Sequence, residues 1–541
     1  LLVKLGHHGG VLAVSALLVI ALGGVSAAML GREYFPHVDA GQLRFQVRFP
    51  SGTRLEETAE RVTQIQREIR QIVPASELQT VYEQIGVPDA VNLSLVDSAV
   101  VGSFEAEIML QLKTPHGPSH EYLSLIRHRI AEKFPDVKMF ERPPDATSRT
   151  LAGSAAAAFE VRLIGRDSAG NLATAREIEQ RLKQVPGAVD VALRQVLDLP
   201  EYQVHIDRTR AAQLGLDAQQ ASRAVLAVLG SAGTVTPVYW TDTVNAIAYT
   251  VQVQARPPNM TSIEELLNAP LRIGSDGQAV LLRNIATITP RTVPASLART
   301  TLAPTISVLA NVEGADLGSV YDRLNGITQS LEGRLKPGNR IEIVGQAGEM
   351  QSAYSELAGG LLMSAALVFL VLVVNFQSWI QPLVAMSGLP VAIAGAAIGL
   401  FVTGTPLSVP ALMGVMMVIG VSTANSVLVT SFARGLVADG HDPELAAYES
   451  AAVRLRPVLM TACAMVLGIV PMALGLGEGG EQNAPLGRAV IGGLLFGTPA
   501  TLILVPSILA VLGRRRPAAA RHAAHPEHVP AAGSAEAAAT P

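Results

Sequence analysis

The chain has 541 residues, of which 49% are hydrophobic and 16% charged, and its mean hydropathy is +0.34. A chain this apolar is not an ordinary soluble enzyme, so we expect a membrane protein with a substantial soluble part. The formal net charge of −4 and the pI near 6.3 argue against a basic nucleic-acid-binding surface, and we expect no nucleic-acid partner.

Six stretches reach the ~17–25 mostly apolar residues that a membrane-spanning helix needs. We predict spans at about 11–30, 357–374, 382–402, 410–429, 457–476 and 489–512. Basic residues precede the first span, separate the fourth from the fifth and follow the sixth, at Lys4, Arg434, Arg454, Arg456 and 514–516. Lys and Arg prefer short cytoplasmic loops, which predicts cytoplasmic termini and residues 31–355 outside. A surface helix is predicted at 436–453.

Residues 31–155 predict a first α/β unit. Alternating apolar residues indicate a strand at 43–49. The spacing of the apolar residues in 55–73 indicates a helix, which a capping box of Thr53 and Glu56 would begin. Strands at 78–85, 104–112 and 137–140 and a helix at 121–134 complete the chain order β-α-β-β-α-β. This order is typical of the split ferredoxin-like arrangement.

A second unit of the same order is predicted at 156–199 and 289–355. Its strands are expected at 159–163, 189–193, 305–312 and 340–344, with helices at 169–185 and 317–335. An insertion at 200–288 separates the two halves and has its own predicted helix at 218–229, a strand at 246–253 and a capping pair of Ser262 and Glu265. A subdomain that protrudes from an α/β core is well placed to dock a neighbouring subunit.

The predicted fold is therefore an α-helical membrane bundle of six spans, with an extracytoplasmic α/β domain of two ferredoxin-like units and an inserted docking subdomain. The predicted boundaries are 1–30 for the first membrane helix, 356–513 for the five-helix bundle and 514–541 for a disordered cytoplasmic tail rich in Ala, Pro and His.

The fourth predicted span carries a polar cluster of Ser422, Thr423, Asn425 and Ser426 near its middle. Polar side chains at membrane depth need partners within the bundle or a wet cavity, because hydrocarbon offers none. Two interpretations stay open. Either the cluster is a functional centre, or its hydroxyls bond to their own helix carbonyls and only Asn425 links this helix to the next.

Several segments carry a resemblance to a known family. They are Phe35-Pro36, NVEGADLGSV at 311–320, FQSWIQPL at 376–383, IGVSTANSVLV at 419–429 and RLRPVLMTACAMVLGIVPMAL at 454–474. With the order of one span, a large outer domain and five spans, the chain resembles the C-terminal half of a resistance-nodulation-division (RND) efflux permease of the acriflavine-resistance, hydrophobe/amphiphile type. The resemblance extends from the first helix through Arg516.

The resemblance implies a secondary transporter of the bacterial inner membrane that exports amphiphilic compounds or drugs. It implies no cofactor other than the proton motive force, and a homotrimer that works with a periplasmic adaptor protein and an outer-membrane channel. A metal-ion efflux member of the same superfamily and a protein-translocation accessory of the SecD/SecF kind are the alternatives. With no phosphate-binding loop and no HExxH or paired-Cys motif, the chain is not predicted to be an enzyme.

The resemblance also implies a proton relay, in which paired aspartates of the N-terminal half work with a lysine, an arginine and a threonine. Arg454 and Thr461 match the last two, whereas Ala424 stands at the lysine position. The candidate relay-support residues are Arg454, Thr461, Asn425, Thr423 and Ser422. The predicted spans have no Asp, Glu, Lys or His in their interiors, so we expect the titrating carboxylates on a missing N-terminal half or a paired subunit.

Phe104, Met139 and Phe140 are the candidate substrate-pocket residues of the first unit. Met109 and Met139 are the only outer-domain methionines there, and a copper or silver exporter would use a methionine cluster as soft ligands. Two methionines at strand positions are more typical of core packing, so no metal site is predicted.

Overall fold

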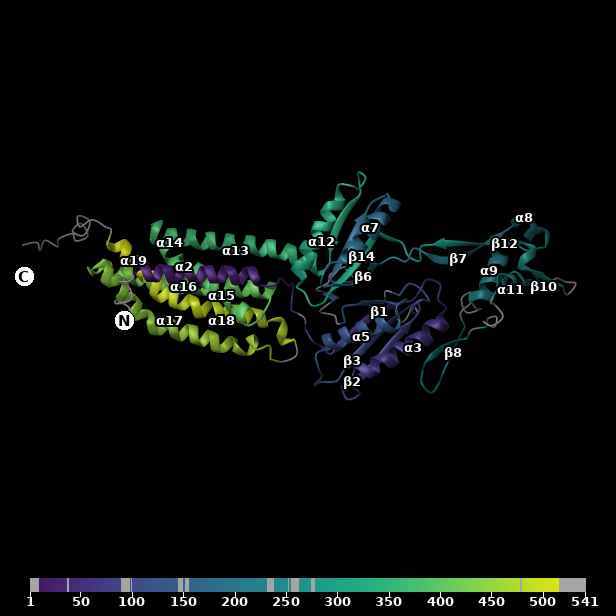
Figure 1. Ribbon diagram of the computed structural model, residues 1–541, viewed down its shortest axis with the longest axis horizontal. Coiled ribbons are helices and arrows are strands. Elements are labelled where there is room, and N and C mark those ends of the chain that lie inside the picture. Colours follow the sequence, from purple (N-terminus) through teal and green to yellow (C-terminus); the bar gives the residue numbers. More distant parts are fainter. Residues whose placement is uncertain are drawn as a thin grey trace, which may run out of the picture.

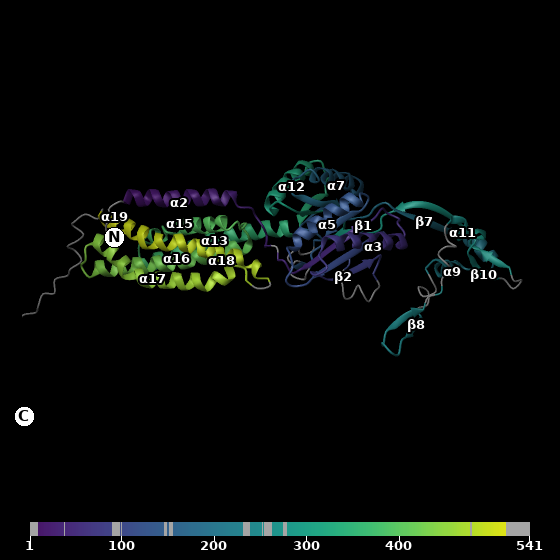
Figure 2. The same cartoon turned by 60° about the horizontal axis from the view of Figure 1, so that its bottom comes forward.

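The structure is a computed structural model that describes residues 9–36, 38–88, 98, 100–144, 149–150, 155–230, 238–251, 253, 262–273, 278–476 and 479–514. The molecule is elongated (Figure 1). A helical bundle occupies one end, two α/β units lie in the middle and the inserted subdomain lies beyond them. Figure 2 shows the same order from a second side.

The described residues contain six helical stretches long and apolar enough to cross a membrane. The bundle consists of α2 (Gly9–Met29), α13 (Gln346–Phe376), α14 (Ile380–Met386), α15 (Leu389–Val402), α16 (Val409–Ala438), α17 (Pro443–Ala473), α18 (Ala484–Pro499), a π-helical turn (Ala500–Leu504) and α19 (Val505–Arg514). The start of α2 and the end of α19 lie at the end of the bundle that is remote from the α/β units. This arrangement agrees with termini on one side and the large domain on the other.

Two helix boundaries differ from the prediction. The separate surface helix at 436–453 is wrong, because α16 runs to Ala438 and α17 begins at Pro443 and continues into the fifth span. Asp442 caps α17 by accepting a hydrogen bond from the Leu445 amide at 3.4 Å, and Pro443 suits the first helical turn. The last stretch begins at Ala484 rather than 489, which brings Arg488 into it.

Unit 1 contains β1 (Gln42–Arg48), α3 (Leu55–Ile72), β2 (Leu78–Ile85), β3 (Glu105–Leu112), α5 (Ser119–Lys133) and β4 (Lys138–Glu141), with the sheet order β2-β3-β1-β4. Alternate strand residues such as Phe45 and Ile108 pack against Ile65 of α3 and Ile126 of α5 in one core. The other strand residues point to the face of the sheet that carries no helix, because side chains alternate along a strand. That face is polar: the Arg44 guanidinium contacts Glu107 at 2.5 Å.

The predicted capping box of α3 is wrong. The N-cap residue is Arg54, and no side-chain hydrogen bond caps the helix there. The Thr53 hydroxyl instead donates to the Pro50 carbonyl at 2.7 Å, within the turn that precedes the helix. The helix begins at Leu55, so Thr53 stands one residue before the N-cap position and its side chain belongs to the preceding turn.

Unit 2 repeats the arrangement with β5 (Phe159–Ile164), α7 (Ser168–Leu182), β6 (Ala188–Leu193), β14 (Ala303–Val312), α12 (Leu317–Glu332) and β15 (Arg340–Val344). β14 lies between β6 and β5, and β15 pairs with the other edge of β5. A short strand, β13 (Ala298–Thr300), pairs with the start of β14. The helix-covered face again holds the core, which includes Phe159, Val161 and Val308.

The insertion leaves unit 2 between β6 and β14 on a two-stranded stalk, β7 (Leu199–Ile206) paired with β12 (Ala286–Val293). The predicted boundary at 288 falls inside β12. The subdomain also contains α8 (Arg208–Gln213), α9 (Ala218–Gly230), β8 (Val238–Thr241), β9 (Ala248–Val251), α11 (Ile263–Leu267), β10 (Pro270–Ile273), β11 (Ala279–Leu281) and a 3-10 turn (Leu282–Asn284). Ser262 and Glu265 form the predicted capping box at α11. The predicted tail beyond residue 514 lies outside the described residues.

Candidate functional site

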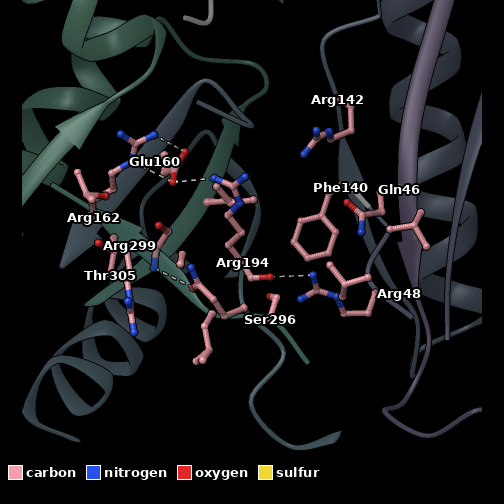
Figure 3. Close-up of a pocket in the computed structure, with 18 of the residues that line it drawn as sticks. Gln46, Arg48, Phe140, Arg142, Glu160, Arg162, Arg194, Ser296, Arg299 and Thr305 are labelled. Atoms are coloured by element: carbon pink, nitrogen blue, oxygen red, sulfur yellow. Dashed lines mark hydrogen bonds and ion pairs between the residues drawn. The ribbon is translucent and has the colours of Figure 1, made fainter. Parts of the chain in front are cut away.

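A cavity of about 700 Å³ lies between the helix-free faces of the two sheets. The cavity is lined from unit 1 by Gln46 and Arg48 of β1 and by Phe140 of β4, and from unit 2 by Glu160 of β5 and Ser307 of β14, among others. Figure 3 shows Arg48 and Phe140 facing the unit 2 residues across the space. Side chains alternate along a strand, so Phe45 and Phe159 point into the cores, whereas the next residues, Gln46 and Glu160, point into this cavity.

The floor of the cavity in unit 2 is an ion cluster around the buried carboxylate of Glu160. The Glu160 carboxylate is 1% exposed and contacts the Arg162 Nε at 3.2 Å and the Arg194 Nη1 at 3.0 Å. Burial tends to raise the pKa of Glu160, but the hydrogen bond from Arg162 and the charges of Arg194 and Arg162 outweigh it, so the pKa is lowered. Glu160 is therefore ionised at neutral pH and holds both guanidinium groups at the cavity wall.

Arg48 connects the two units across the cavity. Its Nε contacts Glu105 Oε1 at 2.5 Å within unit 1. Its two terminal nitrogens donate to the carbonyls of Leu193 and Arg194 in unit 2, at 3.0 and 2.9 Å. The Arg48 Cζ also lies 5.2 Å from the ring centroid of Phe140. One side chain thus couples a carboxylate and an aromatic ring of unit 1 to the backbone of unit 2.

Only one of the three predicted pocket residues lines the cavity. Phe140 does so, whereas Met139 belongs to the apolar core of unit 1 and Phe104 is 1% exposed and is not among the lining residues. Adjacent residues of a strand face opposite ways, so Met139 and Phe140 could not both reach the cleft. Sequence reasoning missed the arginines, although Arg44 and Arg48 occupy the polar positions of the alternating strand β1.

A second junction between the units centres on Arg127 of α5. Arg127 contacts both carboxylate oxygens of Asp190 at 2.8 and 3.1 Å, Glu313 at 2.7 Å and Glu141 at 3.3 Å. The Asn311 amide donates to the Glu141 carbonyl at 3.0 Å and to Asp190 at 3.1 Å. The pKa of Glu141 is raised to about 7, chiefly by burial. The positive charge of Arg127 lowers this pKa, and the negative charges of Asp190 and Glu313 raise it. This junction carries one cation and three carboxylates.

Within the membrane bundle, the polar cluster of α16 is buried. The Thr423 hydroxyl donates to the Ile419 carbonyl of its own helix at 2.7 Å, and the Ser426 and Thr501 hydroxyls lie 3.3 Å apart. Asn425 is 8% exposed, and Ser422 is 3% exposed with no hydrogen-bond partner for its hydroxyl among the described residues. The Ser426 contact reaches the π-helical turn after α18, so this part of the cluster faces α18 and its continuation.

Arg454 and Thr461 of α17 lie elsewhere. The Arg454 Cζ is 5.1 Å from the ring centroid of Phe432 on α16, and the Thr461 hydroxyl donates to the Val458 carbonyl at 3.0 Å. Within the described part of the chain, no hydrogen bond joins either residue to Asn425. Thr461 and Ala424 both lie on faces of their helices that the rest of the chain leaves exposed.

Comparisons with known proteins place these features in context. The model of the AcrB/AcrD/AcrF family matches residues 1–513. The chain is 29% identical over 507 residues to the cation efflux system protein CzcA of Alcaligenes sp. (strain CT14), covering 93% of this chain and 47% of that protein. It is 29% identical, with the same coverage, to the cobalt-zinc-cadmium resistance protein CzcA of Cupriavidus metallidurans. The chain therefore spans about half the length of the curated relatives it matches.

Two solved structures are also similar to this chain. The crystal structure of a heavy metal efflux pump, crystal form II, is similar with a TM-score of 0.76 and 26% sequence identity, covering 94% of this chain and 51% of that one. Crystal form I of the same kind of pump is similar with a TM-score of 0.76, covering 93% and 50%.

Proposed function

We propose that this chain forms one half of a proton-driven efflux permease. The chain belongs to the AcrB/AcrD/AcrF family, and its relatives are RND efflux permeases of the CzcA type. The bacterial inner membrane is its proposed location, with the α/β units and the inserted subdomain in the periplasm. The six apolar helices support this placement. So do Arg434 near the end of α16 and Arg514 at the end of α19, the end that lies remote from the α/β units.

The observation that carries the proposal is the cavity between the two sheets. It is lined by both units, so a relative motion of the units changes its size, which is what a transporter needs for capture and release. We expect Ser296→Trp, at the cavity wall, to abolish efflux by a strain that expresses this chain with a companion N-terminal half. Ser330→Trp, on the exposed surface of α12, is the matched control and should keep efflux. Normal efflux by Ser296→Trp would contradict a transport role for the cavity.

The relatives favour metal cations as the cargo, since their names describe cation efflux and cobalt, zinc and cadmium resistance. Export of amphiphilic compounds is the second candidate, and the apolar wall that Phe140 and Leu297 contribute to the cavity favours it. Resistance assays in a strain without its own pumps separate the two. Protection against zinc and cadmium alone supports metal export, and protection against amphiphiles alone supports the second candidate.

The proposed proton relay uses the exposed faces of α16 and α17. Thr461 and Ala424 lie on these faces, where a companion half could bring titrating carboxylates close to them. We expect Arg454→Ala and Thr461→Ala to abolish proton-driven efflux at normal protein levels. Arg456→Ala, two residues from the half-buried Arg454 and itself exposed, should remain active. If the first two variants pump like the parent, the polar residues of α16 and α17 serve helix packing.

Assembly is proposed to be trimeric, with a periplasmic adaptor and an outer-membrane channel as partners. The hairpin of β8 and β9 supports docking by the insertion, because its large side chains, such as Trp240 at 58% exposed, lie open to the surroundings. Mild crosslinking of the detergent-extracted complex should give trimers, and Trp240→Ser should reduce them. A monomer that survives crosslinking in the parent would contradict the assembly.

A further inference from the structure

We propose that the cavity between the two sheets binds an organic anion: a carboxylate or sulfonate group on an apolar body of drug size. The inference rests on the proposed function in that it names the cargo class of the same cavity. It departs from the cations named for the relatives. Three independent features of the cavity wall support it.

The first feature is the charge of the wall. Five arginines line the cavity, namely Arg48, Arg142, Arg162, Arg194 and Arg299. The lining includes one carboxylate, Glu160, which already contacts Arg162 and Arg194. Glu105 behind Arg48 compensates one further charge. Leaving Arg142 aside, the other four arginines face two carboxylates, so the wall keeps an excess of positive charge. A low-dielectric cleft between two domains concentrates such a field.

The second feature is a set of polar groups that the protein leaves without partners. Gln46 and Gln195 are 5% and 6% exposed, and the Nε2 atom of each is buried with no hydrogen-bond partner among the described residues. The Gln195 Oε1 accepts from the Ser307 amide at 2.9 Å, which fixes its amide group and leaves Nε2 as the unused donor. A buried donor without an acceptor is costly, and an anion supplies acceptors.

Arg299 adds a cation at the rim. It lies on β13, whose hairpin with β14 turns at Thr301 and Leu302, and residues 296–301 form one side of the cavity. No hydrogen bond or ion pair of the Arg299 side chain is formed within the described part of the protein. Figure 3 shows Arg299 on the same side of the space as Arg162 and Arg194, opposite Arg48. Guanidinium groups bind carboxylates and sulfonates through paired N–H donors, which ammonium groups cannot do.

The third feature is the apolar part of the wall, formed by Val100, Val101, Phe140, Leu297 and Leu309. A volume of about 700 Å³ lies in the range of small-molecule sites and exceeds what a hydrated inorganic ion fills. Donors and apolar surface together match a ligand with a charged head and an apolar body. A divalent cation would meet the arginines without the thiolate, imidazole or free carboxylate ligands that bind it well.

Calorimetric titration of the full chain in detergent tests the proposal with three probes: naphthalene-1-sulfonate, trimethyl(1-naphthyl)ammonium as its cationic counterpart, and Zn²⁺. We expect the sulfonate to bind at least tenfold more tightly than the ammonium, and less tightly as salt is raised. Arg299→Gln should weaken sulfonate binding about tenfold and Arg299→Glu further. Arg323→Gln, on the exposed face of α12, should leave it unchanged.

Several outcomes would overturn the anion site. They are no binding of the sulfonate, equal or tighter binding of the ammonium or Zn²⁺, an unchanged affinity in Arg299→Glu, or displacement by inorganic phosphate at the same concentration as the sulfonate. Thermal unfolding of each variant checks that the exposed Arg299 is replaced without loss of the fold. The assay measures no transport. A chain that binds the sulfonate but pumps nothing when expressed with the companion N-terminal half refutes the proposed function alone. A chain that exports Zn²⁺ with that half but does not bind the sulfonate refutes the anion site alone.

Discussion

Replacing Arg127 by Gln should separate the two α/β units at their second junction. The Arg127 side chain is 13% exposed and its bidentate partner Asp190 is 3% exposed, so this pair is buried, whereas Glu313 and Glu141 are about a third exposed. Removing one partner of a buried pair costs about 3–5 kcal/mol, because the other charge stays buried. The two exposed contacts add roughly 0–1 kcal/mol each.

Hydrogen exchange of the backbone amides measures this loss directly. Every 1.4 kcal/mol is a tenfold change in an opening equilibrium, so about 3–5 kcal/mol predicts exchange in β4 and β6 that is faster by roughly 10²- to 4 × 10³-fold. Arg61→Gln is the control, because Arg61 also forms a bidentate contact, at 2.7 Å with Asp136 inside unit 1, and its loss should not affect β6. Unchanged exchange in Arg127→Gln would refute the view that this arginine holds the units together.

Three further predictions concern other parts of the chain. Because burial raises the pKa of Glu141 from 4.5 to about 7, the folded junction holds a proton that the unfolded chain releases; its stability should fall as the pH rises from about 4.5 to 7, and Glu141→Gln should abolish this dependence of hydrogen exchange. Thr301 and Leu302 both have positive φ, 50° and 67°, at a two-residue hairpin turn, so replacing them by Asn and Gly should stabilise the protein by about 1–2 kcal/mol, and a lower melting temperature would contradict this. In a Cys463→Ser background, a cysteine at Ser330 should react with a membrane-impermeant maleimide in intact spheroplasts, and failure to react would contradict an outer location of unit 2.

The secondary structure of the α/β units could be predicted because its signals are local. The strand at 43–49 and the helix at 55–73 each show one apolar face in the sequence. Strand β1 is shifted by one residue at both ends, and α3 starts where predicted and ends one residue earlier. The predicted capping box failed because the N-cap lies one residue later than that box requires: Arg54 is the N-cap, and Thr53 belongs to the preceding turn, where its hydroxyl donates to the Pro50 carbonyl. The membrane helices were predicted from their apolar runs. The start of α17, however, is set by Asp442 and Pro443, which an average of hydropathy does not detect.

The cavity could not be predicted, because it exists only where two sheets far apart in sequence face each other. Arg48 and Glu160 lie in different units, and nothing in either strand alone says that the polar faces meet. The alternation of β1 did place Arg44, Gln46 and Arg48 on one face, and this was the available signal. Choosing Phe104 and Met139 instead favoured apolar residue type over strand position, and both side chains are core packing.

The stalk of β7 and β12 has a consequence for how the molecule can be dissected. Neighbouring strands of a sheet lie about 5 Å apart, so the entry and exit of the inserted subdomain are separated by the width of one hairpin. Residues 207–285 can be excised and the two strand ends joined by a short turn without stretching unit 2. The shortened chain would keep both sheets and the cavity between them, and so would separate the contribution of oligomer contacts from that of ligand capture in a single molecule.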